Sequence, residues 1–319
     1  MKKKQIIVVG SGFMAREYLK VLAHLKHSVI VVGRSPDKVA LLQADYPQFA
    51  YYSGGLDVYL AQSANVVPLY AINAASVNQL QSTSLQLLKA GVKYLLLEKP
   101  GALYIEQLKD LLKASKSEKA KVWIAYNRRF YAAVQELEKQ VVIDGGILSV
   151  NFEFTEWIHT IDPTMYEKEA LQKWIISNSS HVIDTVFALI GLPKTLHAQV
   201  QGQGSIDWHP SGSLFLGSGI SKKGIPFTYH SNWNAPGRWA IEVLTQNRRF
   251  YLKPMEKLQV QLKGSVQINE FPIDDQADVA FKAGLLGQVT AFMSHKSLKL
   301  VPLEEQIKTH AFYDKIGSY

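Results

Sequence analysis

Short apolar runs alternate with helical periodicity along the first 125 residues of the chain. Between the runs, apolar residues recur at helical spacing, as at Met14, Tyr18, Leu22 and Leu25. Runs that are apolar on both faces, joined by amphipathic helices, are typical of a parallel sheet with helical crossovers. We therefore predict a doubly wound α/β domain over residues 1–125. The runs are IIVVG at 6–10, SVIVVG at 28–33, NVVPLYAI at 65–72, YLLLEK at 94–99 and VWIAY at 122–126.

After residue 125 the pattern changes from helix crossovers to consecutive strands. LSVNFEFTEW at 148–157 alternates like a strand with one buried face, after a helical segment from Phe130 to Val141. Helices are expected at 180–190 and, closing the chain, at 278–293. The pattern predicts an α+β domain over residues 126–319 with a large, mostly antiparallel open sheet. Its further strands are expected within residues 195–203, 213–219, 225–233, 238–245, 248–254 and 257–262.

Composition and charge narrow the classes of protein. A chain of 319 residues predicts about two domains, and the absence of cysteine excludes disulfides and thiolate metal sites. The net charge of +8 comes from the first 125 residues, which hold 16 Lys and Arg against 8 Asp and Glu, while the remainder holds 19 of each. The basic residues are not interleaved with aromatic ones, so we expect no nucleic-acid partner. Arg248 and Arg249 are expected to be exposed charges. No apolar run approaches the roughly 18 residues of a membrane span, and we expect a cytoplasmic protein.

A glycine-rich loop follows the first predicted strand and opens a helix. It reads Gly10-Ser11-Gly12-Phe13-Met14-Ala15, a G-x-G-x-x-A pattern in the strand–helix context that a dinucleotide loop requires. The glycines permit a tight turn and close approach of a pyrophosphate, which the helix N-terminus would attract. We predict that residues 10–14 contact a dinucleotide.

The end of the second predicted strand favours NADP(H) over NAD(H). An NAD site usually places an acid about 20 residues after the loop, but this chain has Arg34 and Ser35 there. Arg34 can pair with a 2′-phosphate, Ser35 can donate to it, and Lys38 is near enough to assist.

The fifth apolar run ends in Glu98-Lys99-Pro100, at the carboxyl end of a parallel strand, where ligands bind in doubly wound sheets. Proline ends the strand because it has no N–H to donate. An amine beside a bound nicotinamide could polarise a substrate oxygen while hydride passes at the neighbouring carbon.

Four motifs together resemble the glucose-fructose oxidoreductase, inositol dehydrogenase and rhizopine catabolism (Gfo/Idh/MocA) family of sugar oxidoreductases. They are the glycine loop, AGVKYLLLEKPGAL at 90–103, AYNRRF at 125–130 and HVIDTVFALIG at 181–191. The resemblance implies a Rossmann domain, then an α+β domain whose open sheet often forms oligomer contacts. It also implies a cis Lys99–Pro100 bond, hydride transfer at a sugar or cyclitol carbon, and substrate held between the domains.

The resemblance also implies roles for individual residues. Lys99 carries over as the lysine that works on the reacting oxygen, and His181 as the histidine that exchanges its proton or holds the hydroxyl. The family's usual acid, four residues before that histidine, is replaced by Ser177. Ser177 or Asn178 could hydrogen-bond the substrate but cannot supply a carboxylate's charge. Asp184 could orient His181 or be a structural partner.

The remaining predicted site residues are assigned by type and place. The serines and Asn178 before His181 suit a helix cap, so His181 is expected in a first turn, where the helix dipole favours its neutral form. Core packing is favoured for Trp157 and Trp233, although Trp157 could also line the pocket. No metal-ligand spacing occurs. Predicted substrate contacts are Tyr126, Arg129, Trp157, Asn178 and Arg238; Asn73 and Glu98 complete the cofactor contacts, with Glu98 by the nicotinamide ribose.

The sequence therefore predicts an NADP-dependent oxidoreductase acting on a sugar, amino-sugar or nucleotide-linked sugar. One alternative is a glycosidase that uses a tightly held NAD(P) for transient oxidation. Another, based on Ser177 in place of the acid, is a cofactor-binding protein without chemistry. A homodimer or homotetramer through the C-terminal sheet is expected.

Overall fold

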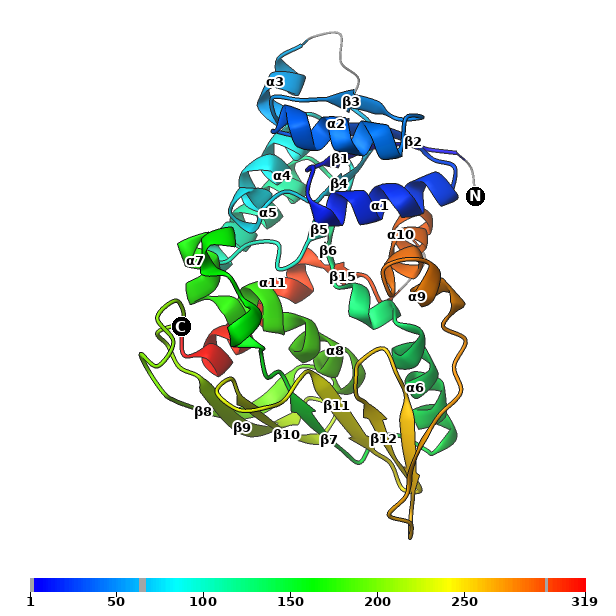
Figure 1. Ribbon diagram of the computed structural model, residues 1–319, viewed down its shortest axis with the longest axis vertical. Coiled ribbons are helices and arrows are strands. Elements are labelled where there is room, and N and C mark those ends of the chain that lie inside the picture. Colours follow the sequence, from blue (N-terminus) through cyan, green and yellow to red (C-terminus); the bar gives the residue numbers. More distant parts are fainter. Residues whose placement is uncertain (1–2, 63–66, 296–297) are drawn as a thin grey trace. The chain divides into compact units, whose positions relative to one another are not determined.

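The computed structural model describes residues 3–62, 67–295 and 298–319, and the chain divides into two compact units (Figure 1). The first two residues of the predicted run at 65–72 lie outside the described residues. The first unit comprises Met1–Tyr126 and Leu285–Ile307, and the second comprises Asn127–Gly284 and Lys308–Tyr319. No helix in the described ranges is both long enough and apolar enough to cross a membrane.

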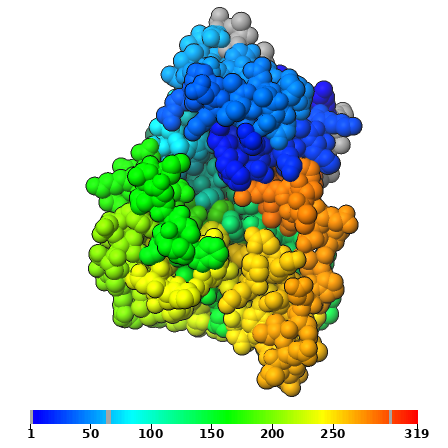
Figure 2. Space-filling view, in the orientation of Figure 1, coloured from blue at the N-terminus to red at the C-terminus, as the bar shows by residue number. Residues whose placement is uncertain are grey.

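The first unit is built on a seven-stranded sheet in the order β15-β6-β5-β4-β1-β2-β3, parallel except for β15. Ile6, Ile7 and Val8 of β1 are all fully buried, because helices cover both faces of the sheet. In the space-filling view, residues of α1 and α2 (blue) form much of the visible face of this unit (Figure 2). The elements are β1 (Gln5–Val9), α1 (Phe13–His24), β2 (Ser28–Val32), α2 (Pro36–Asp45), β3 (Ala50–Tyr52), α3 (Leu56–Ala61), β4 (Tyr70–Asn73), η1 (Val77–Gln79), α4 (Leu80–Lys89), β5 (Tyr94–Glu98), α5 (Ile105–Ser117), β6 (Lys121–Ala125), α10 (Leu285–Ser294) and β15 (Val301–Pro302).

The second unit is built on an eight-stranded sheet in the order β14-β13-β12-β11-β7-β10-β9-β8, in which only the β7–β10 pair is parallel. Val150 and Phe152 of β7 point to the buried face, where α8 packs. Its elements are η2 (Asn127–Phe130), α6 (Ala132–Ile143), β7 (Ser149–Glu153), η3 (Ile158–Thr160), η4 (Pro163–Met165), α7 (Lys168–Gln172), η5 (Ile175–Ser179), α8 (Ser180–Ile190), β8 (Pro193–Gln201), β9 (Leu214–Ser221), β10 (Pro226–Asn232), β11 (Ala240–Leu244), β12 (Arg248–Leu252), β13 (Gln259–Leu262), β14 (Ile268–Glu270) and α9 (Gln276–Ala280); α11 (Leu303–Gly317) begins in the first unit and ends in the second.

The predicted fold class is confirmed, but the C-terminal region differs from the prediction. Residues 285–307 lie with the first unit, because Val301 and Pro302 pair with the outer edge of β6 and α10 packs beside α1. The single helix expected at 278–293 is two helices, since the chain turns at Gly284, whose φ of +72° favours glycine. The final helix, α11, was not predicted.

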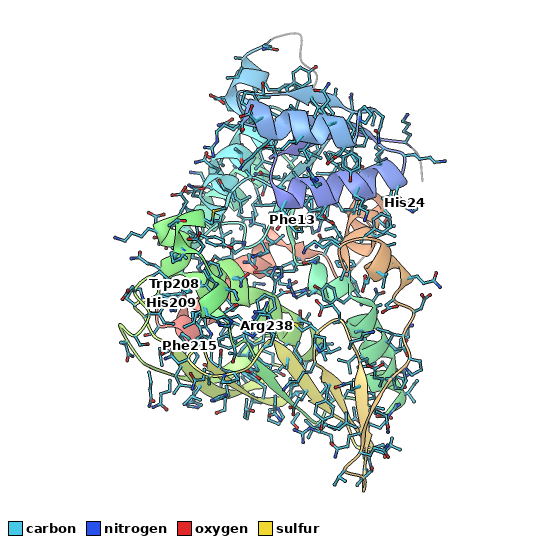
Figure 3. All side chains as sticks on the ribbon, viewed as in Figure 1. Phe13, His24, Trp208, His209, Phe215 and Arg238 are labelled. Atoms are coloured by element: carbon cyan, nitrogen blue, oxygen red, sulfur yellow. The ribbon has the colours of Figure 1, made fainter. Side chains whose placement is uncertain are left out.

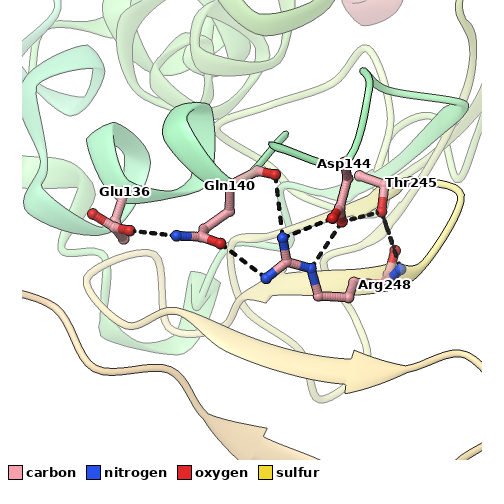
Figure 4. A network of polar contacts seen from close by, with 5 residues as sticks. All are labelled: Glu136, Gln140, Asp144, Thr245 and Arg248. Atoms are coloured by element: carbon pink, nitrogen blue, oxygen red, sulfur yellow. Dashed lines mark hydrogen bonds and ion pairs between the residues drawn. The ribbon is translucent and has the colours of Figure 1, made fainter. Parts of the chain in front are cut away.

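Arg248 is a structural residue, not the exposed charge expected. Its guanidinium donates to both carboxylate oxygens of Asp144 at 2.8 and 2.7 Å and to Gln140 Oε1 at 2.8 Å (Figure 4). Thr245 donates to the same carboxylate, and these contacts, Arg248 first, lower the pKa of Asp144. The network ties the end of α6 to the β11–β12 turn.

Candidate active site

The glycine loop leaves the N-terminus of α1 open. Gly10 has a φ of +123°, and a Cβ there would lie 2.4 Å from the carbonyl oxygen of Ala74, so this position requires glycine. At Gly12, which precedes α1, a Cβ would have nothing within 4 Å. No acidic side chain occupies the first turn of α1, and Phe13 is exposed (Figure 3). The backbone N–H groups at this terminus can therefore receive an anion.

A second helix N-terminus, that of α2, carries the residues predicted to select the cofactor. Arg34 and Lys38 are exposed, and the Ser35 hydroxyl oxygen accepts a hydrogen bond from the Lys38 N–H at 3.4 Å. Because Ser35 acts as acceptor in this cap, its O–H proton is left to donate to a ligand.

Asn73, a predicted cofactor contact, is held by hydrogen bonds within the first unit. Its amide donates to Leu80 O, Thr83 Oγ1 and Ser84 Oγ at 2.7–3.1 Å, and its side-chain oxygen accepts from the Ala75 N–H. The side chain is fully buried at the start of α4. Its contact with the cofactor stays a prediction.

Glu98 is held by a tyrosine of α1. The Tyr18 hydroxyl donates to Glu98 Oε1 at 2.6 Å, and both residues are buried. Burial and then the charge of Glu98 raise the pKa of Tyr18 well above its ordinary value, so the phenol stays protonated and continues to donate. The carboxylate is thereby fixed at the end of β5.

Lys99 lies on a tight turn with a buried anchor. The Lys99–Pro100 bond is cis, which confirms the expectation from the family resemblance, and the Gly101 N–H donates to Glu98 O at 2.9 Å. Gln306 of α11 is fully buried and donates to Pro100 O at 2.9 Å and to the Tyr126 hydroxyl at 3.2 Å. Sequence reasoning missed Gln306, because it is 206 residues from Pro100 and no local pattern marks it.

Tyr126 and Arg129 were predicted to bind substrate, and each has contacts within the fold. Tyr126 is 1% exposed and belongs to the apolar core of the first unit. Arg129 forms a buried bidentate pair with Asp184, with Nε to Oδ2 at 2.8 Å and a second bond of 2.7 Å. Of the two roles left open for Asp184, this contact is the structural one. Both substrate contacts stay predictions.

A π-helical turn, η5, precedes α8 and changes the expected environment of His181. Because the helix runs on upstream, Ser179 is helical and forms no side-chain cap, so the predicted capping is wrong. The Ser177 hydroxyl donates to Ala170 O at 2.8 Å, toward α7. π-Helical turns occur often at functional sites. The turn is braced by the Tyr319 hydroxyl, which accepts from the Ile175 N–H at 3.1 Å.

Asn178 and Ser179 of this turn converge on a buried acid, Glu156. Its Oε1 accepts from Ser179 Oγ at 2.6 Å and from Asn178 Nδ2 at 3.0 Å, and Arg238 lies 3.6 Å from its Oε2. Burial raises the pKa of Glu156, and the contacts with Ser179, Arg238 and Asn178 oppose that rise. Glu156 was missed, because it lies beyond the end of β7, where Phe154, Thr155 and Glu156 are all buried and no alternation marks the acid.

Aromatic rings and guanidinium groups surround this acid. The Arg238 guanidinium, in the β10–β11 connection (Figure 3), lies 4.5 Å from the ring centre of Trp157 and 5.0 Å from that of Trp239. The Arg128 guanidinium also lies over the Trp239 ring, at 4.5 Å. The His181 ring is 6.0 Å from the Trp239 ring. Trp157 is 47% exposed, with its N–H bonded to Gly237 O, so the favoured core packing is wrong for it.

For Trp233, core packing is confirmed, since it is 2% exposed. Within residues 3–62, 67–295 and 298–319, no group of three or more His, Asp or Glu side chains could hold a metal ion. Of the predicted substrate contacts, the second unit therefore brings together Trp157, Asn178 and Arg238, around Glu156.

These features define a class: a two-domain protein with a doubly wound dinucleotide domain and an α+β domain on an open antiparallel sheet. Residues 4–126 match the family model described as an oxidoreductase family with an NAD-binding Rossmann fold. Over these residues the chain is similar to the Gfo/Idh/MocA oxidoreductase family, and the matched segment has that family's NAD-binding Rossmann fold.

Solved structures share the whole fold at low sequence identity. An oxidoreductase of Agrobacterium radiobacter, in complex with NAD+, L-tartaric acid and magnesium, is 15% identical with a TM-score of 0.76, over 98% of this chain and 95% of that one. The UDP-N-acetylglucosamine 3-dehydrogenase of Acidithiobacillus ferrooxidans is 15% identical, with a TM-score of 0.76 over 100% and 98%. Biliverdin reductase of Synechocystis, with biliverdin and NADP+, is 13% identical, with a TM-score of 0.74 over 98% of each chain. No curated protein sequence matches the chain.

Proposed function

We propose that the protein is an NADP-dependent oxidoreductase that transfers hydride between the nicotinamide and a sugar, amino-sugar or nucleotide-linked sugar. One observation carries this proposal: the glycine loop and Lys99 follow β1 and β5, parallel strands with only β4 between them. The carboxyl ends of parallel strands lie at one edge of a sheet, so the loop and the amine share the ligand-binding edge.

NADP(H) is proposed over NAD(H) because Arg34 and Lys38 are exposed beside the Ser35 cap and no acid follows β2 directly. Both NAD+ and NADP+ occur in similar structures, so the preference rests on these side chains. Arg34→Asp should reverse the ratio of kcat/KM for the two cofactors, whereas Lys89→Asp, an equal charge change on α4, should leave it unchanged. An unaltered ratio in Arg34→Asp would refute the assignment.

For the chemistry, we propose that Lys99 polarises the reacting oxygen and that His181 holds the hydroxyl or exchanges its proton. We propose only a secondary substrate contact for Ser177, because its hydroxyl already donates to the backbone carbonyl of Ala170. Lys99→Ala should reduce kcat by about 10²-fold or more. Lys89→Ala is the matched control. Turnover that persists undiminished in Lys99→Ala would remove the lysine from the mechanism.

A nucleotide-linked sugar is the substrate that the side chains of the second unit support best. Arg129 is paired with Asp184, but Arg128 and Arg238 flank Trp239 and could meet a diphosphate. The exposed Trp157 ring suits a sugar face. Among similar structures, one is a UDP-N-acetylglucosamine 3-dehydrogenase.

The test is an absorbance screen of NADP+ and NADPH against nucleotide sugars, free keto-sugars and polyols. Nucleotide sugars should be turned over, and Arg238→Met should raise their KM more than that of any free sugar. Equal effects on both substrate types would exclude a diphosphate contact. Tight retention of cofactor without net NADPH change would favour the NAD(P)-dependent glycosidase instead.

The open face of the second sheet is proposed as the contact of a homodimer or homotetramer. On β10, Thr228 and His230 are exposed while Phe227 and Tyr229 are buried, and Ile220 of β9 is 45% exposed. Ile220→Asp should therefore shift the mass measured by light scattering toward the monomer. We also propose that the enzyme works in the cytoplasm, since a chain without cysteine makes no demand for an oxidising compartment.

A further inference from the structure

Tyr319 links the π-helical turn η5 to the core beside the second sheet. Its hydroxyl oxygen accepts a hydrogen bond from the Ile175 N–H at 3.1 Å and lies 2.6 Å from Nε2 of His209. His209 is fully buried, and its ring lies 4.7 Å from that of Trp233 and 5.9 Å from that of Phe215 (Figure 3). All of these residues belong to the second unit. One end of the link is therefore a packed aromatic core, and the other is the first residue of η5.

The hydrogen bonds of this link have only one possible direction. The carbonyl oxygen of Gly212 lies 2.8 Å from Nδ1 of His209, and a carbonyl can only accept, so Nδ1 carries the proton of the neutral ring. Burial lowers the pKa of His209 to about 4, so the ring is neutral at pH 7. Nε2 is then an acceptor, and the Tyr319 hydroxyl donates to it. Ser211 Oγ lies farther from this nitrogen, at 3.4 Å.

A second contact ties the same stretch of chain to α11. The Lys173 ammonium group lies 3.4 Å from Asp314 Oδ1 and 4.8 Å from the centre of the Tyr319 ring. Asp314 Oδ2 lies 3.0 Å from Nδ1 of His310, four residues earlier on the same helix. Lys173 and Ile175, where the chain enters η5, are thus both held from α11 and Tyr319.

The linked element carries side chains that were predicted to meet the substrate. A π-helical turn is rare and occurs often at functional sites, and η5 is one such turn between α7 and α8. Its Asn178 and Ser179 donate to Oε1 of Glu156 at 3.0 and 2.6 Å, and Arg238 lies 3.6 Å from the other carboxylate oxygen. The bond to Glu156 uses one N–H of the Asn178 amide, which can offer its second N–H and its oxygen to a hydroxyl group.

We propose that Tyr319 is a positioning residue for the substrate: by fixing η5 to His209, it keeps Asn178 where its amide can hydrogen-bond the sugar. This inference rests on the proposed oxidoreductase function. Tyr319 acts through η5 and does not itself touch the substrate. Support of this kind matters because a binding group must be held close to its productive position by the residues behind it.

Tyr319→Phe tests the proposal, because it removes both hydrogen bonds of the hydroxyl and keeps the ring beside Lys173. We expect KM for the sugar substrate to rise about tenfold, with kcat changed less than about twofold. The Kd for NADPH should stay unchanged, since the glycine loop lies in the first unit. Partial unfolding would give a different result, because a smaller active fraction lowers the apparent kcat and leaves KM as it was.

Tyr229→Phe is the matched control. Tyr229 is also buried in the second unit, and within the described residues its hydroxyl has no hydrogen-bond partner, so the substitution removes the same atom but no bond. This variant should keep the wild-type KM, and thermal unfolding establishes that both variants are folded. A Tyr319→Phe enzyme with the wild-type KM would overturn the proposal, and so would an equal rise of KM in Tyr229→Phe.

Hydrogen exchange of the protein alone separates this inference from the proposed function. In Tyr319→Phe, the backbone amides of residues 175–179 should exchange about tenfold faster than in the wild type, while those of the distant strand β12 should not change. Tyr229→Phe should leave both sets unchanged. If the wild type turns over no sugar in the screen, the proposed function fails, and exchange still decides whether Tyr319 holds η5. Unchanged exchange at residues 175–179 would overturn the inference whether or not a substrate is found.

Discussion

Alanine substitutions at Gly10 and Gly12 should have different effects, because the fold requires glycine at position 10 and the dinucleotide requires it at position 12. At Gly10, a Cβ would lie 2.4 Å from Ala74 O and 2.7 Å from Ala74 C, both backbone atoms, and φ is +123°. Unfavourable φ costs about 1–3 kcal/mol, and overpacking adds about 1–3 kcal/mol. Backbone strain and overpacking together should therefore lower the free energy of unfolding of Gly10→Ala by about 2–6 kcal/mol.

At Gly12 the same substitution should leave stability almost unchanged. Its φ is −91°, and a Cβ there would have no neighbour within 4 Å. That open space is where the pyrophosphate is expected to approach the backbone, so the added methyl should raise the Kd for NADPH by at least about tenfold, or 1.4 kcal/mol.

The assay is urea denaturation without cofactor, followed by fluorescence titration with NADPH. Gly10→Ala should lower the unfolding midpoint, and Gly12→Ala should change only the Kd. Equal stability loss in the two variants would refute the steric reasoning, and a Gly12→Ala protein that binds NADPH like the wild type would show that the dinucleotide does not approach there.

Three further predictions concern buried polar contacts. Arg129→Met should lose about 3–5 kcal/mol in urea denaturation, because it leaves Asp184 buried without its cation, and adding Asp184→Leu should recover much of the loss. Gln306→Ala should lower kcat/KM about tenfold and the free energy of unfolding by about 1–3 kcal/mol, because the carbonyl of Pro100, next to Lys99, loses its hydrogen-bond donor. Unchanged kinetics with lowered stability would show that Gln306 has a structural role only. Burial lowers the pKa of His209 from 6.5 to about 4, so between these pH values the unfolded chain binds a proton that the folded chain does not. The free energy of unfolding should therefore fall by up to about 3 kcal/mol as the pH drops from 6.5 to 4. His209→Gln should reduce this pH dependence in denaturation curves measured at pH 7 and 5.

Much of the fold could be predicted because its signals are local. Runs such as IIVVG and the alternation at 148–157 report burial directly, and the bounds expected for the helix at 180–190 match α8, Ser180–Ile190. The single helix at 278–293 was wrong because the turn at Gly284 depends on its φ of +72° and on Asp278, which accepts its N–H. The pairing of Val301 with Ile124 joins residues too distant for any periodicity to connect.

The candidate site shows the same division between local and distant information. The glycine loop and the cis bond after Lys99 are motif properties, and the structure has the loop and the bond where they were expected. Which of two adjacent arginines pairs with a buried acid is a tertiary property, so the sequence alone does not distinguish Arg129, which pairs with Asp184, from Arg128, which lies by Trp239. Glu156 was missed for the same reason, since its hydrogen bonds come from Asn178 and Ser179, more than 20 residues away along the chain.

The strand pairing of Val301 and Pro302 with β6 has a consequence for synthesis of the chain. On a ribosome, β1 to β6 emerge early, but the partner of β6 follows only after the whole second sheet has been made. Until then, the backbone groups along the outer side of β6 are open to pairing with another nascent chain. An expression clone that stops at residue 126 would retain that exposed edge and lack α10, so isolation of a stable cofactor domain calls for a graft of residues 285–307 as well.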